Sequence, residues 1–173
     1  PFQSGSDRIL KAMNRRYTAQ EYLDLVQYAK SVMPGLVLTS DVIVGFPGET
    51  DEDFEKTLEL VNAVEYDALF TFLFSPRRGT PAASLPDPMP KEDKQRNFDR
   101  LVARQNEISA ALRRADVGKV LRCLIDGRDG AFLTARTEGG RLVRLVGDDS
   151  LIGQFRPIAI TDATTWSLSG TCI

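Results

Sequence analysis

The first half of the chain alternates between helical and extended hydrophobic patterns. Apolar residues recur at helical spacing in the segments 7–13, 19–33 and 51–64. The segments 36–44 and 66–74 are instead rich in the β-branched and aromatic side chains that favour strands. Because helices and strands alternate, the pattern predicts a parallel sheet covered by crossover helices. Residues 36–44 are apolar at both ends, as a strand buried on both faces would be, but Thr39, Ser40 and Asp41 form a polar notch between them.

Local signals mark where these elements begin and end. Thr18 followed by Glu21 forms a capping box, and Pro34 with the glycine after it ends the helix that starts there. Thr50, followed by three acidic residues, begins the next helix. Residues 1–4 have the pattern of the last residues of a strand, so we expect the chain to start in the middle of a fold.

A change of pattern near Asp116 predicts a second domain. Three prolines in residues 85–90 predict an extended crossover, and a basic helix of roughly 25 residues follows it. Beyond that helix come short β-prone segments separated by Gly and Asp, at residues 119–125, 131–137, 142–146, 155–161 and 166–169. Short strands joined by tight turns predict a small closed barrel, and hence the domains 1–115 and 116–173.

Composition restricts the chemistry that is open to this chain. With 173 residues, 42% of them hydrophobic, the chain is expected to be globular. It has neither an 18-residue apolar run nor a signal-peptide pattern, so we expect a cytoplasmic protein without a membrane partner. It contains no histidine and only two cysteines, Cys123 and Cys172, which we expect to be small apolar residues of the barrel. We therefore predict no metal site, and chemistry that depends on a cofactor, on carboxylates or on residues elsewhere.

Charge is distributed unevenly along the chain. The net charge is -2, but residues up to Pro90 carry 8 basic against 13 acidic side chains, and the residues after it carry 14 against 11. The C-terminal half is therefore the better candidate for phosphate contacts. The alternative is a solvated helix face with no partner.

Three predicted loops follow strand ends and mix glycine with polar side chains. They comprise residues 3–7, 41–49 and 75–80. Any one of them could be an ordinary turn, but ligands bind where the carboxyl ends of parallel strands converge. Three such loops in succession predict a ligand site at one end of the sheet.

These loops carry recognisable motifs. Residues 3–18, 41–50 and 70–83 together resemble the radical S-adenosylmethionine (SAM) methylthiotransferases, and residues 135–137, 150–153 and 166–170 are similar to the TRAM domain of that family. The resemblance implies an α/β fold: the C-terminal half of a radical SAM partial (β/α) barrel, followed by a small OB-like TRAM barrel. One departure is Arg78, where the family pattern has proline, and we expect it to loosen its loop.

The resemblance also implies a set of SAM contacts. Ile43, Gly45 and Glu49 match the family pattern IxGxxxE, in which backbone at the strand end meets the adenine. The remaining implied contacts are polar groups for the ribose and methionyl parts, or groups at the mouth of the barrel: Gln3, Ser4, Ser6, Arg15, Asp41, Ser75 and Arg77.

Alternatives remain for several of these contacts. Glu49 could merely stabilise a helix N-terminus through the helix dipole. Thr39, Ser40 and Asp41 could satisfy one another inside the fold, and Arg15 could contact tRNA phosphate instead of the SAM carboxylate.

In function, the resemblance implies an enzyme that adds a methylthio group to isopentenylated adenosine beside the tRNA anticodon. Its partners would be the anticodon stem-loop and a reductant protein, and the full-length enzyme would be a monomer. In the barrel, Lys119, Arg136, Arg141 and Arg144 are the expected RNA contacts. The alternatives are threonylcarbamoyl adenosine or a ribosomal protein as the substrate, or a non-catalytic RNA-binding module.

The cofactors implied by the resemblance are SAM and two [4Fe–4S] clusters. The cluster-binding CxxxCxxC motif of the family is absent from these residues, and we expect it to precede Pro1. We therefore expect that residues 1–173 alone bind no cluster and are inactive.

Overall fold

A long helix, α4 (Lys91–Arg114), links two units in the computed structural model, which describes residues 1–173. The first unit is Pro1–Gln105 and the second is Asn106–Ile173, so the division falls within α4. The domain boundary expected at Asp116 lies between the end of α4 and the first barrel strand. None of the helices combines the length and the hydropathy that crossing a bilayer requires.

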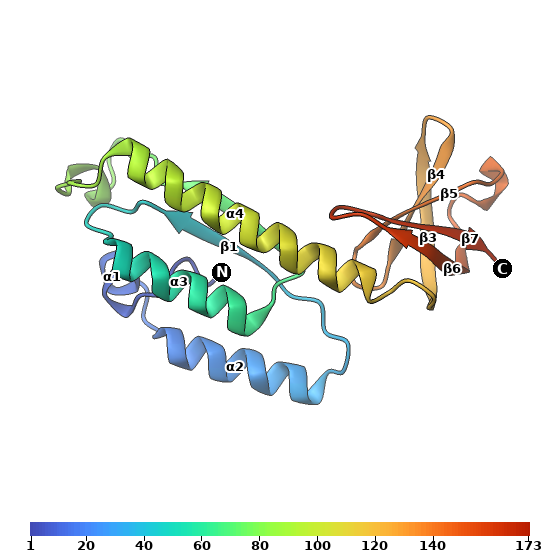
Figure 1. The fold of residues 1–173 in the computed structure, drawn as a ribbon, viewed down its shortest axis with the longest axis horizontal. Helices are drawn as coiled ribbons and strands as arrows, with labels where there is room; N and C mark the ends of the chain where they lie inside the picture. Colours follow the sequence, from blue (N-terminus) through green and yellow to red (C-terminus); the bar gives the residue numbers. More distant parts are fainter. The chain divides into compact units, whose positions relative to one another are not determined.

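The first unit contains the predicted alternation of helices and strands (Figure 1). Its capping boxes are formed as expected, because the hydroxyl groups of Thr18 and Thr50 each accept a backbone N–H three residues later. The elements besides α4 are α1 (Asp7–Ala12), α2 (Ala19–Val32), β1 (Thr39–Val44), α3 (Asp51–Val64), β2 (Ala68–Leu73) and the 3-10 turn η1 (Pro81–Ser84).

The two strands pair in parallel, with Asp41 opposite Phe70 and Ile43 opposite Phe72. Gln3 pairs with Val42 on the other edge of β1, so the first residues of the chain do run as a strand end. Three segments from distant parts of the sequence therefore lie side by side and point in the same direction. This is the arrangement that brings the three predicted loops to one end of the sheet.

Burial on β1 alternates instead of covering both faces. Ser40, Val42 and Val44 are buried, whereas Asp41 and Ile43 are only partly buried. On β2, Phe70 and Phe72 are 60% and 52% exposed. Residues 36–44 are therefore not buried on both faces as their apolar ends suggested, because no element of the first unit covers the face that carries Asp41 and Phe72.

The helix α2 also leaves apolar side chains uncovered. Its apolar residues recur at helical spacing, but only Val26 is buried, and Leu25 and Val32 are 65% and 54% exposed. Tyr22 does reach the interior, where its hydroxyl accepts a hydrogen bond of 3.0 Å from the hydroxyl of Tyr66. Helical periodicity identified the apolar residues correctly, but they spread over more of the helix surface than this unit covers.

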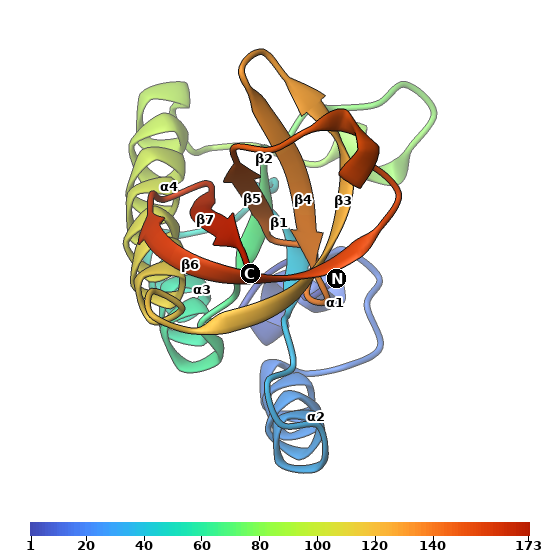
Figure 2. The same ribbon diagram turned by 90° about the vertical axis from the view of Figure 1, so that its right-hand side faces the viewer.

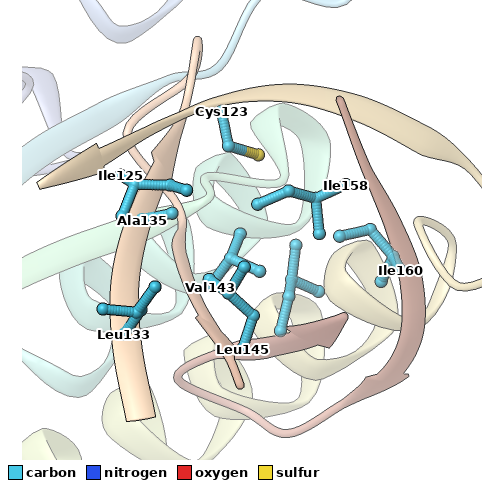
Figure 3. Close-up of a cluster of buried hydrophobic side chains, with 9 residues drawn as sticks. Cys123, Ile125, Leu133, Ala135, Val143, Leu145, Ile158 and Ile160 are labelled. Carbon is cyan, nitrogen blue, oxygen red and sulfur yellow. The ribbon is translucent and has the colours of Figure 1, made fainter. Parts of the chain in front are cut away.

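The second unit contains the predicted closed barrel, in the strand order β3-β4-β5-β7-β6 (Figure 2). Its interior is filled by the side chains drawn in Figure 3, including Cys123, Leu133, Val143 and Ile158, all of them fully buried. The elements are β3 (Val120–Asp129), β4 (Phe132–Thr137), β5 (Leu142–Leu145), the 3-10 turn η2 (Asp149–Leu151), β6 (Phe155–Ala163) and β7 (Leu168–Cys172).

Candidate functional site

A pocket of about 550 Å³ lies at the carboxyl ends of β1 and β2. This volume is within the range of sites for small molecules and cofactors. The residues that line it come from all three parallel segments and from the chain that follows β2: Gln3, Asp41, Ile43, Phe72, Leu73, Phe74, Ser75, Arg77, Thr80 and Ala82.

Gln3 enters this pocket through an unusual backbone conformation. Its φ is +63°, in the left-handed region that few residues other than glycine adopt. Two backbone hydrogen bonds to β1 hold this conformation. The Gln3 N–H donates to the carbonyl of Asp41 at 3.1 Å, and the Ile43 N–H donates to the carbonyl of Gln3 at 3.0 Å. A strained residue held in this way is typical of ligand sites.

Asp41 places a carboxylate in the pocket that has no hydrogen-bond or ion-pair partner within the chain. Its neighbour Ser40 is turned to the other face, where its hydroxyl accepts a hydrogen bond of 3.0 Å from the backbone N–H of Phe2. The polar residues of β1 therefore do not satisfy one another. A carboxylate in this position can bind a cationic group of a ligand.

The chain after β2 supplies aromatic rings, a hydroxyl and a cation. Phe74 packs edge-on against Phe46, with 5.2 Å between the ring centroids, and this fixes the wall of the pocket. Arg77 is exposed and its carbonyl accepts hydrogen bonds from the backbone and the hydroxyl of Thr80, at 3.1 and 2.8 Å. The turn is therefore closed, although Arg78 stands where proline was expected.

Glu49 closes the loop after β1 and does not line the pocket. Its side chain is 3% exposed, and its Oε2 accepts a hydrogen bond of 2.6 Å from the N–H of Gly45. Burial raises the pKa of Glu49 to about 7, although the hydrogen bond from Gly45 opposes that change. Gly45 and Glu49 thus hold the turn that ends at the pocket.

Ser4 and Ser6 bind other parts of the protein. The Ser6 hydroxyl donates to Asp53 at 2.6 Å, and the Ser4 hydroxyl lies 3.4 Å from that of Thr57. Arg8 also pairs with Asp53 and donates to the carbonyl of Gly48 at 2.7 Å. Burial alone would raise the pKa of Asp53, but hydrogen bonds from Arg8, Ser6 and Thr50 hold it well below its usual range.

The structure therefore divides the predicted SAM contacts into two groups and leaves Arg15 outside both. Gln3, Asp41, Ile43, Ser75 and Arg77 line one pocket. Ser4, Ser6, Gly45 and Glu49 shape the loops around it through bonds within the chain, and Arg15 is exposed beyond the end of α1.

Sequence reasoning missed the apolar part of the pocket, formed by Phe72, Phe74 and Ala82. The signal was present in the alternation of Phe70, Phe72 and Phe74, because residues two apart on a strand share a face.

In the barrel, all the predicted RNA contacts are engaged in ion pairs. Lys119 and Arg141 both pair with Asp116, whose side chain is only 9% exposed. Arg136 pairs with Asp126 at 3.1 Å, and Arg144 with Asp129 at 2.9 Å. Lys119 and Arg141 therefore neutralise a buried carboxylate, which is a structural task.

Comparisons with known proteins give one profile match in each unit. Residues 1–61 match the profile of the radical SAM superfamily, and residues 114–173 match that of the TRAM domain. The chain is 49% identical over 173 residues to a protein of Clostridium botulinum (strain Langeland) named tRNA-2-methylthio-N(6)-dimethylallyladenosine synthase, covering 98% of this chain and 38% of the relative.

A protein of the same name from Acetivibrio thermocellus is 45% identical over 176 residues, covering 100% of this chain and 37% of the relative. The similarity runs through both units. The chain spans well under half the length of these curated relatives.

Proposed function

We propose that the chain is part of a radical SAM tRNA methylthiotransferase acting on dimethylallyl (isopentenylated) adenosine beside the anticodon, because residues 1–61 match the radical SAM profile and residues 114–173 match the TRAM profile. The observation that carries the proposal is the 45% to 49% identity, through both units, to proteins named for that reaction. The pocket at the strand ends supports it, because it contains groups suited to SAM.

The donor set of the pocket fits SAM. The Asp41 carboxylate suits the ammonium group of the methionyl moiety, and Arg77 suits its carboxylate. Phe72, Phe74 and Ile43 offer an apolar surface for the adenine. When bound, SAM supplies the radical chemistry and the methyl group of the reaction.

The residues of this chain contribute binding and orientation. Gln3 is held by β1 on both sides, and the turn at Gly45 is held by Glu49, so the pocket wall is formed before a ligand arrives. Such preorganisation lowers the cost of ordering the ligand in one geometry.

Residues 1–173 do not offer a fitting set of ligands for an iron–sulfur cluster. Their only cysteines belong to the barrel, where Cys123 is fully buried and burial raises the pKa of its thiol to about 11. A cluster needs several thiolates close together, so we assign its ligands to none of these residues.

A chimeric enzyme tests the proposal. Residues 1–173 would replace the aligned region of the Clostridium botulinum relative, which would supply everything outside that region. The chimera is produced in cells that lack their own synthase, and the methylthio group on dimethylallyladenosine is measured in digested tRNA by mass spectrometry. We expect the modified nucleoside to return.

Two substitutions in the chimera locate the chemistry. Asp41→Asn and Arg77→Ala should reduce the modified nucleoside at least tenfold, whereas Arg78→Ala, an exposed neighbour outside the pocket lining, should leave it unchanged. A soluble chimera that leaves this nucleoside unmodified would contradict the proposal. Analysis of threonylcarbamoyl adenosine and of ribosomal protein from the same cells would then identify the substrate.

A further inference from the structure

An arginine lies over an exposed aromatic ring on the outside of the barrel. The guanidinium carbon of Arg122 is 4.0 Å from the ring centroid of Phe155, and Phe155 is 53% exposed. We propose that this pair binds an unpaired nucleobase of the tRNA substrate by stacking. The inference rests on the proposed function, since it names the surface of the barrel that would hold the RNA.

The register of the barrel shows which residues share this surface. Leu124 on β3 lies opposite Phe155 on β6, and Arg122 lies opposite Pro157. The intervening Cys123 is fully buried, so Arg122 and Leu124 face outward. We call the surface formed by Arg122, Leu124, Phe155 and Pro157 the stacking platform.

A second arginine borders the platform. Arg136 on β4 lies opposite Leu124 and is exposed, so Leu124 lies between Arg136 on one neighbouring strand and Phe155 on the other. Arg136 pairs with Asp126, but half of the Arg136 side chain remains exposed. This arrangement offers a base the guanidinium plane of Arg122 backed by the Phe155 ring, and it offers positive charge to the phosphates beside that base.

Arg122 is free to exchange its carboxylate partner for a phosphate. Its ion pair with Glu138 is 3.4 Å long, and the two side chains are 60% and 74% exposed. Exposed pairs of this kind contribute little and are screened by salt. Arg141 differs, because its side chain is 14% exposed and pairs with the buried Asp116.

The chemistry of the platform favours a single-stranded RNA. Sequence-tolerant recognition of RNA relies on aromatic rings and guanidinium planes on which unpaired bases stack. Strand faces of small OB-like barrels are a common site for this recognition. A base within a duplex has both faces covered by its neighbours, so the platform should prefer a loop.

Binding measurements on the 173-residue chain test the platform. The probe is a fluorescein-labelled RNA with the sequence of the tRNA anticodon stem-loop, followed by fluorescence anisotropy. Phe155→Ala should weaken binding roughly 5- to 150-fold, the range expected for the loss of one stacked base. Phe155→Trp keeps a ring and should bind within about threefold of wild type.

Phe132 provides the matched control. It is another barrel phenylalanine, 43% exposed, with no guanidinium over its ring. Phe132→Ala should leave the affinity unchanged. Thermal melting of each variant shows whether a change in binding merely reflects a loss of folded barrel.

Salt dependence separates the two parts of the platform. Arg122→Ala should weaken binding and reduce the slope of log affinity against log salt by roughly one, as expected when one phosphate contact is lost. Phe155→Ala should leave that slope unchanged, because stacking releases no counterions. Arg122→Lys should keep the slope but lose part of the affinity, since an ammonium cannot stack as a plane.

The outcomes distinguish this inference from the proposed function. Wild-type affinity in Phe155→Ala, or equal binding of the stem-loop and a fully paired duplex, would overturn the stacking platform while an active chimera kept the enzymatic assignment. An inactive chimera together with RNA binding that depends on Phe155 would remove the enzymatic assignment and leave the platform standing.

Discussion

At Gly45 the backbone after β1 turns with a φ of +74°, and a Cβ atom there would lie 2.6 Å from Cδ of Lys94. Gly35 has a similar φ, +78°, but a Cβ there would meet nothing within 4 Å. The two glycines therefore share a conformation and differ in their surroundings. Comparing them separates backbone strain from steric overlap.

We predict that Gly35→Ala lowers the free energy of unfolding by about 1 kcal/mol, since alanine tolerates a positive φ poorly. Gly45→Ala should cost roughly 2–4 kcal/mol, because the side chain of Lys94 must also move. Urea unfolding of the two variants measures the difference. Equal losses would show that Lys94 yields without cost and that strain alone accounts for Gly45.

Glu49 should make stability depend on pH near neutrality. Its pKa is raised from 4.5 to about 7 in the folded chain, so the folded state binds a proton more tightly than the unfolded state does. The charges around it are those of Asp53, Lys94 and Arg8. Its contribution is therefore fully present below about pH 4.5 and is lost as the pH rises through about 7.

We predict that Glu49→Gln removes this dependence. The amide oxygen can still accept the N–H of Gly45, and it does not ionise. Between pH 5 and 8 the wild type should lose about 2–3 kcal/mol relative to the variant. Urea unfolding at four pH values measures this, and parallel curves would show that the folded carboxyl group titrates at its ordinary pKa.

Among the elements, α3 depends on its first turn for its attachment to the rest of the first unit. Asp53 completes the capping box with Thr50 and also accepts hydrogen bonds from Ser6 and Arg8. One carboxylate, 4% exposed as a residue, thus joins the helix to the loop that follows Gln3.

We predict that Asp53→Asn lowers the free energy of unfolding by about 2–3 kcal/mol, because a charged acceptor of several hydrogen bonds is lost. Asp93→Asn is the control, since Asp93 pairs with Arg96 at the exposed surface of α4, and it should change stability by less than about 0.5 kcal/mol. If the two variants are equally stable, Asp53 is only a surface cap.

The elements that sequence predicted well are those specified by local patterns. Capping signals at Thr18 and Thr50 and the glycine-bounded strands of the barrel involve residues close in sequence, and all are present. The exposure of apolar residues on α2, such as Leu25, does not follow from the pattern, because periodicity shows which residues share a face and not what covers that face.

The candidate site was predictable to the level of its loops. Parallel topology alone implies that the loops at the carboxyl ends of the strands, which contain Gln3, Asp41 and Ser75, converge. The hydrogen bond from Ser6 to Asp53 and the ion pair between Arg141 and Asp116 join residues that are distant in sequence, so no local pattern encodes them. The contact between Arg122 and Phe155 was missed for the same reason.

At the scale of the whole molecule, each unit has buried apolar residues of its own. Leu133 is fully buried in the barrel, and Val61 is fully buried in the first unit. Because each residue packs within its own unit, damage to one core should leave the other folded. This independence would allow RNA binding and the pocket to be studied separately.

We predict that Leu133→Ala costs the barrel about 2–5 kcal/mol, the range for truncating a buried leucine. Its packing is tight, since a Cβ on Gly147 would lie 2.7 Å from Cδ1 of Leu133. Hydrogen–deuterium exchange with mass spectrometry should show faster exchange in β3 to β7 and unchanged exchange in β1 and α3. Val61→Ala should give the reverse pattern. Faster exchange of β1 in Leu133→Ala would mean that α4, which both units share, makes them unfold together. Binding defects of barrel variants would then have to be corrected for the loss of stability of the whole chain.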